Sequence, residues 1–171
     1  MENTIENKVA QSGLIQLDLE TIRIPGDRIF FDMKPLLFMD LVLKEKEFRA
    51  FLANHPWEQY QGKHIAISCS SDAIIPTWAF MLLSAQMSPF ASTIVYGNLE
   101  ELEKELFLKS LFALNLDTYK DGRVVVKGCS KESVPTDSYV RLTALLQPIV
   151  KSLFFGEPCS TVPIYKKKAI N

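Results

Sequence analysis

Short apolar strands alternate with helices through the central and C-terminal parts of the chain, and this alternation constrains the fold more than any other feature. The sequence predicts strands over residues 63–70, 92–97 and 123–128, and helices over residues 76–87, 99–115 and 135–156, the last interrupted at Pro148. Alternating strands and helices form a parallel sheet with helices on its faces. We therefore expect a three-layer α/β fold with a mainly parallel sheet in the order β-α-β-α-β-α.

The residues before this alternation predict an antiparallel addition to the sheet. Residues 14–24 alternate between apolar and polar side chains, as a half-buried strand does. Residues 25–27 form a turn signal, and residues 28–33 are expected to return as the second strand of a hairpin. Residues 35–43 fit a short helix or a strand, whereas residues 44–55 fit a helix. The expected fold therefore carries N-terminal antiparallel edge strands.

The length of 171 residues, with no low-complexity tract, fits a single α/β domain over residues 1–171. Residues 1–12 are expected to form a loose N-terminal arm, and residues 166–171 a polar C-terminal tail.

Charge and composition exclude several classes of protein. The net charge is −1, with 19 basic and 20 acidic residues spread along the chain, which lacks the basic footprint of a nucleic-acid-binding protein. The N-terminal sequence MENTIENK lacks a basic start and an apolar stretch, and no apolar run is long enough to span a bilayer. We expect a cytoplasmic protein that binds neither nucleic acid nor membrane.

Three cysteines, Cys69, Cys129 and Cys159, form the most informative group of side chains. Each is followed by a serine and has a proline within seven residues. The count is odd and the cytosol is reducing, so a disulfide framework is not expected. The thiols are therefore buried apolar groups, metal ligands or nucleophiles.

Two of the loops that carry these cysteines resemble each other. Cys69 begins CSSDAIIPT and Cys129 begins CSKESVPT, each after a predicted strand and before a predicted helix. The N-terminus of a helix favours the thiolate, the form that binds metals and attacks electrophiles. Asp72 and Glu132 occupy matching positions, where they either serve as further ligands or favour the helix N-terminus.

The position of a shared site depends on the order of the strands. Ligands of open α/β sheets bind outside the carboxyl ends of the strands. We predict the order 2-1-3 for the strands at 63–70, 92–97 and 123–128, because this order places Cys69 beside Cys129 at a spacing of about 4.8 Å between strands.

Cys159 lies in the stiff segment GEPCSTVP, residues 156–163, whose two prolines favour extended backbone. The predicted helix before this segment runs away from the carboxyl ends of the strands, so the segment must turn back for Cys159 to reach them. We predict that it does, and that Cys69, Cys129 and Cys159 hold one metal ion or a small cluster, with Asp72 and Glu132 as further candidates.

Other recognisable sites are not indicated. His64 begins its strand at the end opposite Cys69, and His55 finishes a helix, so a Cys–His catalytic pair is disfavoured. No C-x2-C pair favours zinc, and no glycine-rich fingerprint indicates a nucleotide. An iron–sulfur cluster or a redox thiol fits the spacing better. Lys127 adds positive charge at the carboxyl ends. The apolar side chains of the helix at 76–87 are expected to belong to the core: Trp78, Phe80, Met81 and Leu82.

The sequence GKHIAISCSSDAIIPTWAFMLLSAQMSPFA (62–91) and residues 149–168 resemble a bacterial family known as domain of unknown function 2480. The resemblance covers most of the chain. It implies an association with iron–sulfur assembly genes, and hence a protein partner in iron–sulfur assembly. It brings no catalytic pattern, so no catalytic residue is assigned.

Three hypotheses from different classes follow. The first is a metal-binding or iron–sulfur-binding accessory protein with Cys69, Cys129 and Cys159 as ligands. The second is a small thiol-dependent enzyme whose nucleophile is Cys69 or Cys129. The third is a non-catalytic protein-interaction module whose cysteines are buried.

Overall fold

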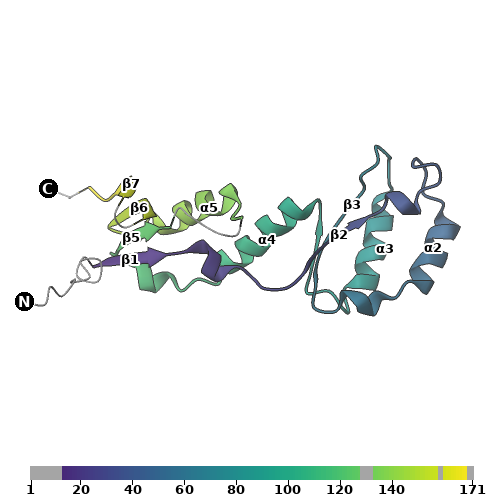
Figure 1. Cartoon of the computed structure of the whole chain (residues 1–171), viewed down its shortest axis with the longest axis horizontal. Coiled ribbons are helices and arrows are strands. Elements are labelled where there is room, and N and C mark those ends of the chain that lie inside the picture. Colours follow the sequence, from purple (N-terminus) through teal and green to yellow (C-terminus); the bar gives the residue numbers. More distant parts are fainter. Residues whose placement is uncertain (1–12, 128–132, 158–159, 169–171) are drawn as a thin grey trace, which may run out of the picture. The chain divides into compact units, whose positions relative to one another are not determined.

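The chain forms two compact units. The structure, a computed structural model, describes residues 13–127, 133–157 and 160–168. Unit 1 comprises residues 1–24 and 106–171, and unit 2 comprises residues 25–105 (Figure 1). Residues 1–24 therefore belong to unit 1, residues 25–105 form unit 2, and the remainder of the chain completes unit 1.

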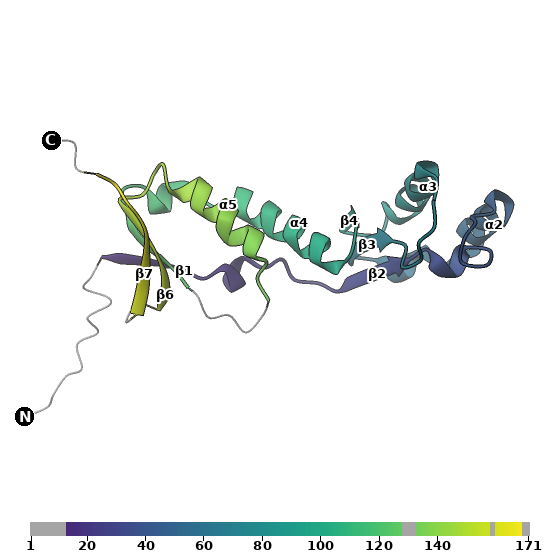
Figure 2. The same cartoon turned by 90° about the horizontal axis from the view of Figure 1, so that it is seen from above.

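Unit 2 contains a three-stranded parallel sheet in the order β2-β3-β4. Its elements are β2 (Arg28–Asp32), the 3-10 helix η2 (Lys34–Leu36), α2 (Glu45–Asn54), η3 (Trp57–Tyr60), β3 (His64–Ser68), α3 (Thr77–Met87) and β4 (Thr93–Tyr96). Ile65 and Ile67 of β3 pack in one core with Phe48 of α2 and Leu83 of α3, so both helices cover the same face of the sheet (Figure 2).

Unit 1 contains a four-stranded sheet in the order β1-β5-β6-β7, in which only the pairing of β6 with β7 is antiparallel. Its elements are β1 (Leu14–Leu17), η1 (Leu19–Ile22), η4 (Leu116–Tyr119), β5 (Arg123–Val126), α5 (Thr136–Leu146), β6 (Ser152–Glu157) and β7 (Ser160–Lys166). Helix α4 (Leu99–Phe112) contributes its first residues to unit 2 and the rest to unit 1. A separate core joins Val124 and Val126 of β5 to Leu142 of α5.

The two units repeat one arrangement of elements: a strand, a 3-10 helix, a helix, a 3-10 helix, a strand, a helix and a strand. The sequences EKEF (45–48) and EKEL (103–106) fall in the first helix of each unit. Further on, Pro76 matches Pro135 and Gly97 matches Gly156, and both pairs are 59 residues apart. We conclude that the chain is a nested duplication, in which unit 2 occupies the connection between η1 and the helix of unit 1.

The two strands that end each repeat also pair in the same register. His64 lies opposite Thr93 in unit 2, and Arg123 lies opposite Ser152 in unit 1. Gly97 directly follows β4 and Gly156 lies near the end of β6, with φ values of 135° and 122°, which glycine adopts without strain. Residues at equivalent positions of the two units can therefore be compared one by one.

The structure confirms a mixed α/β fold with mainly parallel sheets, and it confirms that β3 and β4 are parallel neighbours. The prediction that residues 123–128 join the same sheet is wrong, because β5 pairs with β1 and β6. The predicted N-terminal antiparallel hairpin is also wrong. Strands β1 and β2 belong to different sheets, and each is parallel to its neighbour. Strand β1 also ends earlier than expected, because Asp18 accepts a hydrogen bond from the backbone N–H of Glu20 and so begins η1.

The predicted helix over residues 135–156 is too long. Helix α5 ends at Leu146, two residues before Pro148, and residues Ser152–Glu157 form β6. Proline lacks the N–H that the next helical turn needs and clashes with the preceding turn. The apolar residues after it therefore pair with β5 as a strand instead of continuing the helix.

The expectation of a single domain over residues 1–171 stays a prediction. Over the residues that the structure describes, no helix has the length and apolar character needed to cross a membrane.

Candidate functional site

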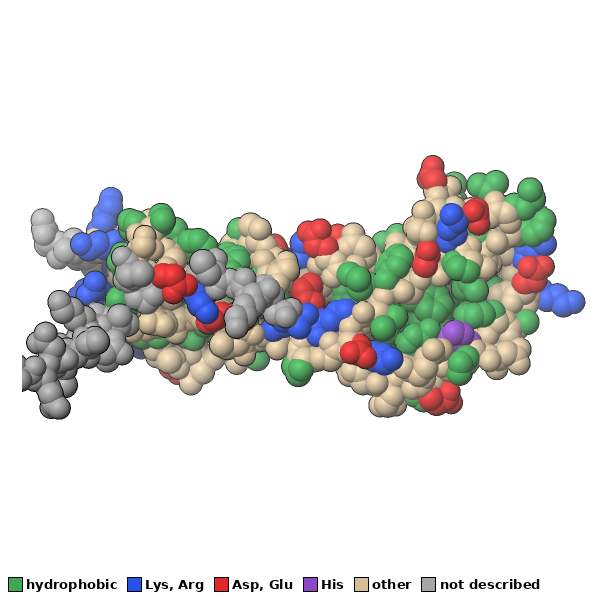
Figure 3. Space-filling model, in the orientation of Figure 1, with side chains coloured by type: hydrophobic (Ala, Val, Ile, Leu, Met, Phe, Trp, Pro, Cys, Tyr) green, Lys and Arg blue, Asp and Glu red, His purple; other side chains and the backbone are tan. Residues whose placement is uncertain are grey.

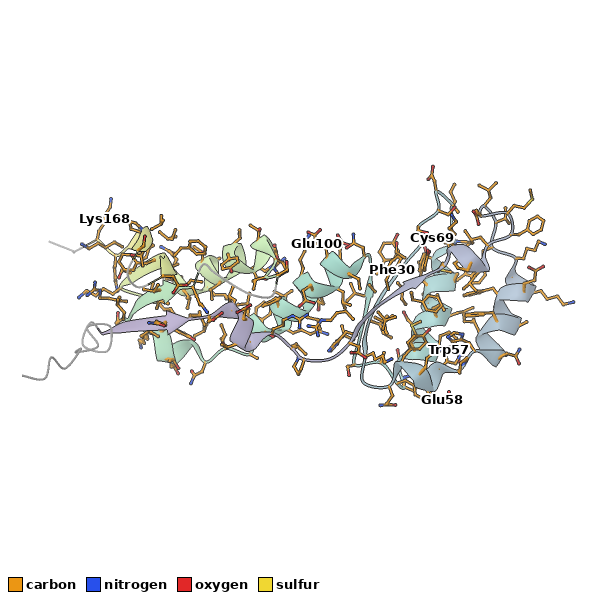
Figure 4. The ribbon with its side chains drawn as sticks, viewed as in Figure 1. Phe30, Trp57, Glu58, Cys69, Glu100 and Lys168 are labelled. Carbon is orange, nitrogen blue, oxygen red and sulfur yellow. The ribbon has the colours of Figure 1, made fainter. Side chains whose placement is uncertain are left out.

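Of the three cysteines, the structure describes Cys69. It follows the carboxyl end of β3 in unit 2, where it is half-buried and packs against the core (Figure 4). Asp72, three residues further on, is exposed. The other expected ligands, Cys129, Glu132 and Cys159, lie outside the described residues.

The predicted strand order is wrong. Strand β3 lies between β2 and β4, whereas β5 belongs to the other sheet. Adjacent strands therefore do not bring Cys69 beside Cys129, although a site shared by the cysteines stays a prediction. Among the residues that can be described, no three His, Cys, Asp or Glu side chains form a group that could hold a metal ion.

The turn after Cys69 is fixed by a carboxylate from the neighbouring strand. Asp32 ends β2, and its Oδ1 accepts hydrogen bonds from the backbone N–H groups of Ser70 and Lys34, each at 2.9 Å. Its Oδ2 accepts a hydrogen bond from the hydroxyl of Ser70 at 2.6 Å. Burial raises the pKa of Asp32, but the hydrogen bonds from Ser70 and Lys34 outweigh it and the pKa is lowered. The ionised carboxylate thus holds the Cys69–Ser70 turn against β2.

Unit 1 has a carboxylate at the equivalent strand end. Asp18 follows β1, and its Oδ2 accepts a hydrogen bond from Nζ of Lys127 at 2.8 Å. This bond lowers the pKa of Asp18 and raises the pKa of Lys127. The positive charge that Lys127 brings to the carboxyl ends is therefore paired within the unit.

In unit 1, the two strands that precede cysteine-bearing connections end side by side. Strands β5 and β6 are parallel neighbours, with Val126 opposite Phe155. Lys127 precedes the connection that contains Cys129, while Glu157 and Ser160 flank the connection that contains Cys159. Because β6 is a strand parallel to β5, its carboxyl end lies at the same edge as that of β5.

The outer surface of α3 is the least expected feature of unit 2. The helix TWAFMLLSAQM contains no charged residue. Met81 is 68% exposed, whereas Trp78 and Leu82 are half-buried. At the two positions equivalent to Trp78 and Leu82, helix α5 carries Asp137 and Arg141, which form an ion pair. The two helices share one scaffold, but only α5 has the charged outer surface usual for a helix facing water.

Two grooves border this part of α3. The groove toward α2 is lined by Glu45, Arg49, Trp78, Met81 and Leu82. The groove toward β4, called here the α3–β4 groove, is lined by Ile75, Thr77, Phe80, Met81, Ser84 and Tyr96. We define the docking surface of unit 2 as the α3–β4 groove together with Trp78, Leu82 and Ala85.

The α3–β4 groove has a counterpart in unit 1. Phe80 meets Tyr96 edge-on, with ring centroids 5.1 Å apart and planes at 86°. The equivalent rings of Tyr139 and Phe155 meet at 5.6 Å and 86°. In unit 1 the pocket beside these rings is also lined by Ile164 of β7.

A second apolar feature of unit 2 is the loop between η2 and α2. Its exposed side chains include Phe38, Met39, Leu41 and Val42. Figure 3 shows hydrophobic side chains gathered over this loop and elsewhere on the visible face of unit 2. Ser71 donates a hydrogen bond from its hydroxyl to the carbonyl of Asp40 at 2.6 Å, which ties the loop to the turn after Cys69.

The sequence carries one signal at the docking surface, the absence of charge from residues 77–87, but this signal alone suggests a buried helix. The interpretation of Met81 as a core residue is wrong, because its side chain faces solvent. The predictions for the histidines are correct. His64 begins β3, at the end of the strand opposite Cys69, and His55 caps the end of α2.

The fold defines a class of protein: a mixed α/β protein built from two nested units, each with a mainly parallel sheet. Its sequence belongs to the family described as protein of unknown function (DUF2480), whose model matches residues 3–167. Comparisons with curated proteins and with solved structures found no match.

Proposed function

We propose that this protein is a non-catalytic protein-interaction module and that the docking surface of unit 2 binds its partner. The observation that carries the proposal is the difference between α3 and α5. Equivalent positions hold Trp78 and Leu82 on α3 but the ion pair of Asp137 and Arg141 on α5. Trp78 and Leu82 are packed in part against the core of unit 2, and the Trp78 ring lies 6.1 Å from that of Phe48 in α2. Their solvent-facing parts and the exposed Met81 nevertheless form an uncharged surface, and a partner for α3 accounts for it.

The side chains of the docking surface are those that protein interfaces favour. Trp, Tyr, Phe and Met are enriched in interface cores, where charged residues are depleted. Met81 and Tyr96 are exposed, and Trp78 and Phe80 are half-buried beside them. Flexible Met81 can adapt to a partner, while the ring pair of Phe80 and Tyr96 supplies a rigid wall.

Site-specific photo-crosslinking in living cells tests this proposal. A benzoyl-phenylalanine placed at Met81 should form one discrete adduct with another protein. The same probe at Val140, the equivalent position on α5, should form none. The two positions are 68% and 64% exposed, so accessibility is matched.

Charge at the docking surface should remove the adduct. Ala85→Lys adds a cation to an exposed position on α3, and Ala144→Lys makes the same change at the equivalent exposed position on α5. The first variant should lower the yield of adduct at least tenfold, because the ammonium group would be buried against an apolar partner. Equal adducts from positions 81 and 140, or an adduct that survives Ala85→Lys, would contradict the proposal.

The arrangement of β5 and β6 favours a second candidate function. We propose that Cys129 and Cys159, with Cys69, bind a metal ion or an iron–sulfur cluster, in a cytoplasmic protein with a partner in iron–sulfur assembly. The support is that β5 and β6 lie side by side and end at the same edge, so the connections after them start close together. Asp72 and Glu132 remain further candidate ligands.

Iron content tests the second candidate. Protein purified without oxygen should carry iron and absorb visible light, and Cys159→Ala should lose both while the circular dichroism spectrum is retained. Protein without iron, or iron that survives Cys159→Ala, would contradict the metal proposal. Neither result bears on the docking surface, because the crosslinking experiment does not depend on metal.

A further inference from the structure

The two sheets differ at one edge. In unit 1, β7 pairs antiparallel with β6. In unit 2, β4 is equivalent to β6, and it is the last strand of its sheet over the described part of the chain. The duplication therefore leaves β4 without the strand that covers its counterpart.

The backbone of β4 directs hydrogen-bonding groups toward this open edge. Gly97 donates its N–H to the carbonyl of Ile67 in β3. Because the backbone groups of a strand alternate between its two sides, Ile94 and Tyr96 direct theirs away from β3. Their equivalents in unit 1, Leu153 and Phe155, lie opposite residues of β7.

The side chains at the ends of β4 and β6 differ in exposure in the way that the presence of β7 in unit 1 predicts. Tyr96 is 71% exposed, whereas its equivalent Phe155, covered by β7, is 36% exposed. In unit 1, Ile164 of β7 lines the pocket formed by Tyr139 and Phe155. In unit 2, the α3–β4 groove has the equivalent rings but no side chain from such a strand among its lining residues.

Strand β4 is short, with four residues, but its sequence carries no charged or proline residue that would protect an exposed edge. Soluble proteins block open edges with charged side chains, prolines or bulges, because an open edge pairs with other chains. Residues 93–96 read TIVY, with no charge and no proline, and the strand pairs with β3 without a register shift. An unprotected strand edge beside an uncharged helix indicates a surface that binds another chain.

We propose that β4 binds an extended segment of a partner protein as an antiparallel fourth strand, with a branched apolar side chain in the α3–β4 groove. This inference rests on the proposed function and specifies how the partner binds. The occupant is inferred from β7, whose sequence STVPIYK is rich in β-branched residues and which places Ile164 in the equivalent pocket. Backbone hydrogen bonds supply affinity in such strand addition, and the side-chain pocket supplies specificity.

A synthetic peptide of residues 160–168, STVPIYKKK, serves as the probe. Titrated into the full-length, nitrogen-15-labelled chain, it should shift the amide signals of Ile94 and Tyr96 more than those of Leu153 and Phe155. A peptide of the same composition in scrambled order should not produce these shifts. The same peptide N-methylated at the residue equivalent to Val162 should bind at least tenfold more weakly, because that residue lies opposite Phe155 in unit 1.

Variants of the chain separate backbone pairing from side-chain contact. Tyr96→Pro removes an outward N–H and should weaken binding at least tenfold, whereas Tyr96→Ala keeps the N–H and should weaken it less. Val140→Lys, in the pocket that β7 already borders, should leave binding unchanged. The N-methylated peptide tests the same hydrogen bonds without any change to the protein, so the proposal does not depend on the proline variant folding.

Three results would overturn the strand-addition proposal. They are peptide shifts confined to unit 1, binding that is unaffected by both Tyr96→Pro and N-methylation, and a dimer of the chain that Tyr96→Pro dissociates in equilibrium sedimentation. If the crosslink from Met81 persists while any of these is found, the docking surface stands and strand addition does not. If that crosslink is absent as well, the proposed function fails with it.

Discussion

In unit 2, a single carboxylate fixes the turn that follows the central strand. Asp32 holds the Cys69–Ser70 turn, and the equivalent carboxylate of unit 1, Asp18, pairs with Lys127 directly after β5. The sequence places Cys69 correctly after a strand, because apolar runs that end in polar residues mark strand ends. It does not reveal Asp32 as the residue that holds the turn, because that contact joins segments 38 residues apart.

Asp32→Ala should destabilise the protein by about 1–3 kcal/mol, because it removes three hydrogen bonds at a partly buried site. Urea denaturation monitored by circular dichroism measures the change. Asp72→Ala alters an exposed carboxylate close by and should have almost no effect. Since the pKa of Asp32 is lowered in the folded state, its contribution is present above about pH 4 and is lost as the pH falls through that lowered pKa. If Asp32→Ala and Asp72→Ala lower the free energy of unfolding equally, Asp32 does not stabilise the turn after Cys69.

His55 should make the stability of the protein depend on pH. Burial lowers the pKa of His55, whose Nε2 lies 2.9 Å from the hydroxyl of Tyr60. The unfolded chain therefore binds a proton more readily than the folded one, so the free energy of unfolding should fall as the pH drops through about 6.5. In the same denaturation experiment, His55→Gln should reduce the difference between the free energies of unfolding measured at pH 7.5 and at pH 5.5. If the stability of this variant depends on pH as strongly as that of the original protein, His55 is not the source of the pH dependence.

At the scale of elements, the sequence predicts strands β3 and β4 and their parallel pairing, because apolar strands alternate with helices there. It fails at β6, since a short apolar run after Pro148 fits the end of a helix as well as a strand. It also fails at β1 and β2, since an alternating pattern sets which face is buried but not the direction of the neighbouring strand. The docking surface was missed for a related reason: an uncharged helix suggests burial, and only the structure shows that one of its faces is exposed.

Gly97→Ala and Gly156→Ala should each destabilise the protein by about 1–3 kcal/mol. Both glycines have φ values that other residues avoid, and an added Cβ would lie 2.9 Å from Cβ of Glu101 or 2.6 Å from the carbonyl oxygen of Ser160. Gly13→Ala is the control for close contacts: its φ of 62° is also strained for alanine, but no atom lies within 4 Å of the added Cβ, so it should cost less. Thermal denaturation compares the three variants, and a control as damaging as the other two would indicate that contacts at the strand ends are unimportant.

At the scale of the whole molecule, the chain is one supersecondary arrangement used twice, the second copy inserted into the first. The repeated turns around Cys69 and Cys129 are visible in the sequence, but the nesting is not. The segments of unit 1 are separated by all of unit 2, so β1 gives no sequence signal that its partner is β5. Comparison of the two copies shows that, within the described part of the chain, unit 2 has no strand equivalent to β7.

A substitution in the core of one unit should destabilise that unit more than the other. Leu83 and Leu142 are equivalent and fully buried, one in each core cluster. Leu83→Ala and Leu142→Ala should each cost about 2–5 kcal/mol. Hydrogen exchange read residue by residue by NMR should show the larger loss of protection in the unit that carries the substitution. A loss spread equally over both cores by either variant would contradict two separate cores.

The open edge of β4 is the central claim, and amide hydrogen exchange of the free chain tests it most directly. Leu153 and Phe155, which lie opposite β7, should be protected, whereas Ile94 and Tyr96 should exchange rapidly although they lie in a strand of equivalent position. Addition of the peptide of residues 160–168 should slow exchange at Ile94 and Tyr96. If these two amides are already as protected in the free chain as Leu153 and Phe155, the edge is occupied and the account is contradicted.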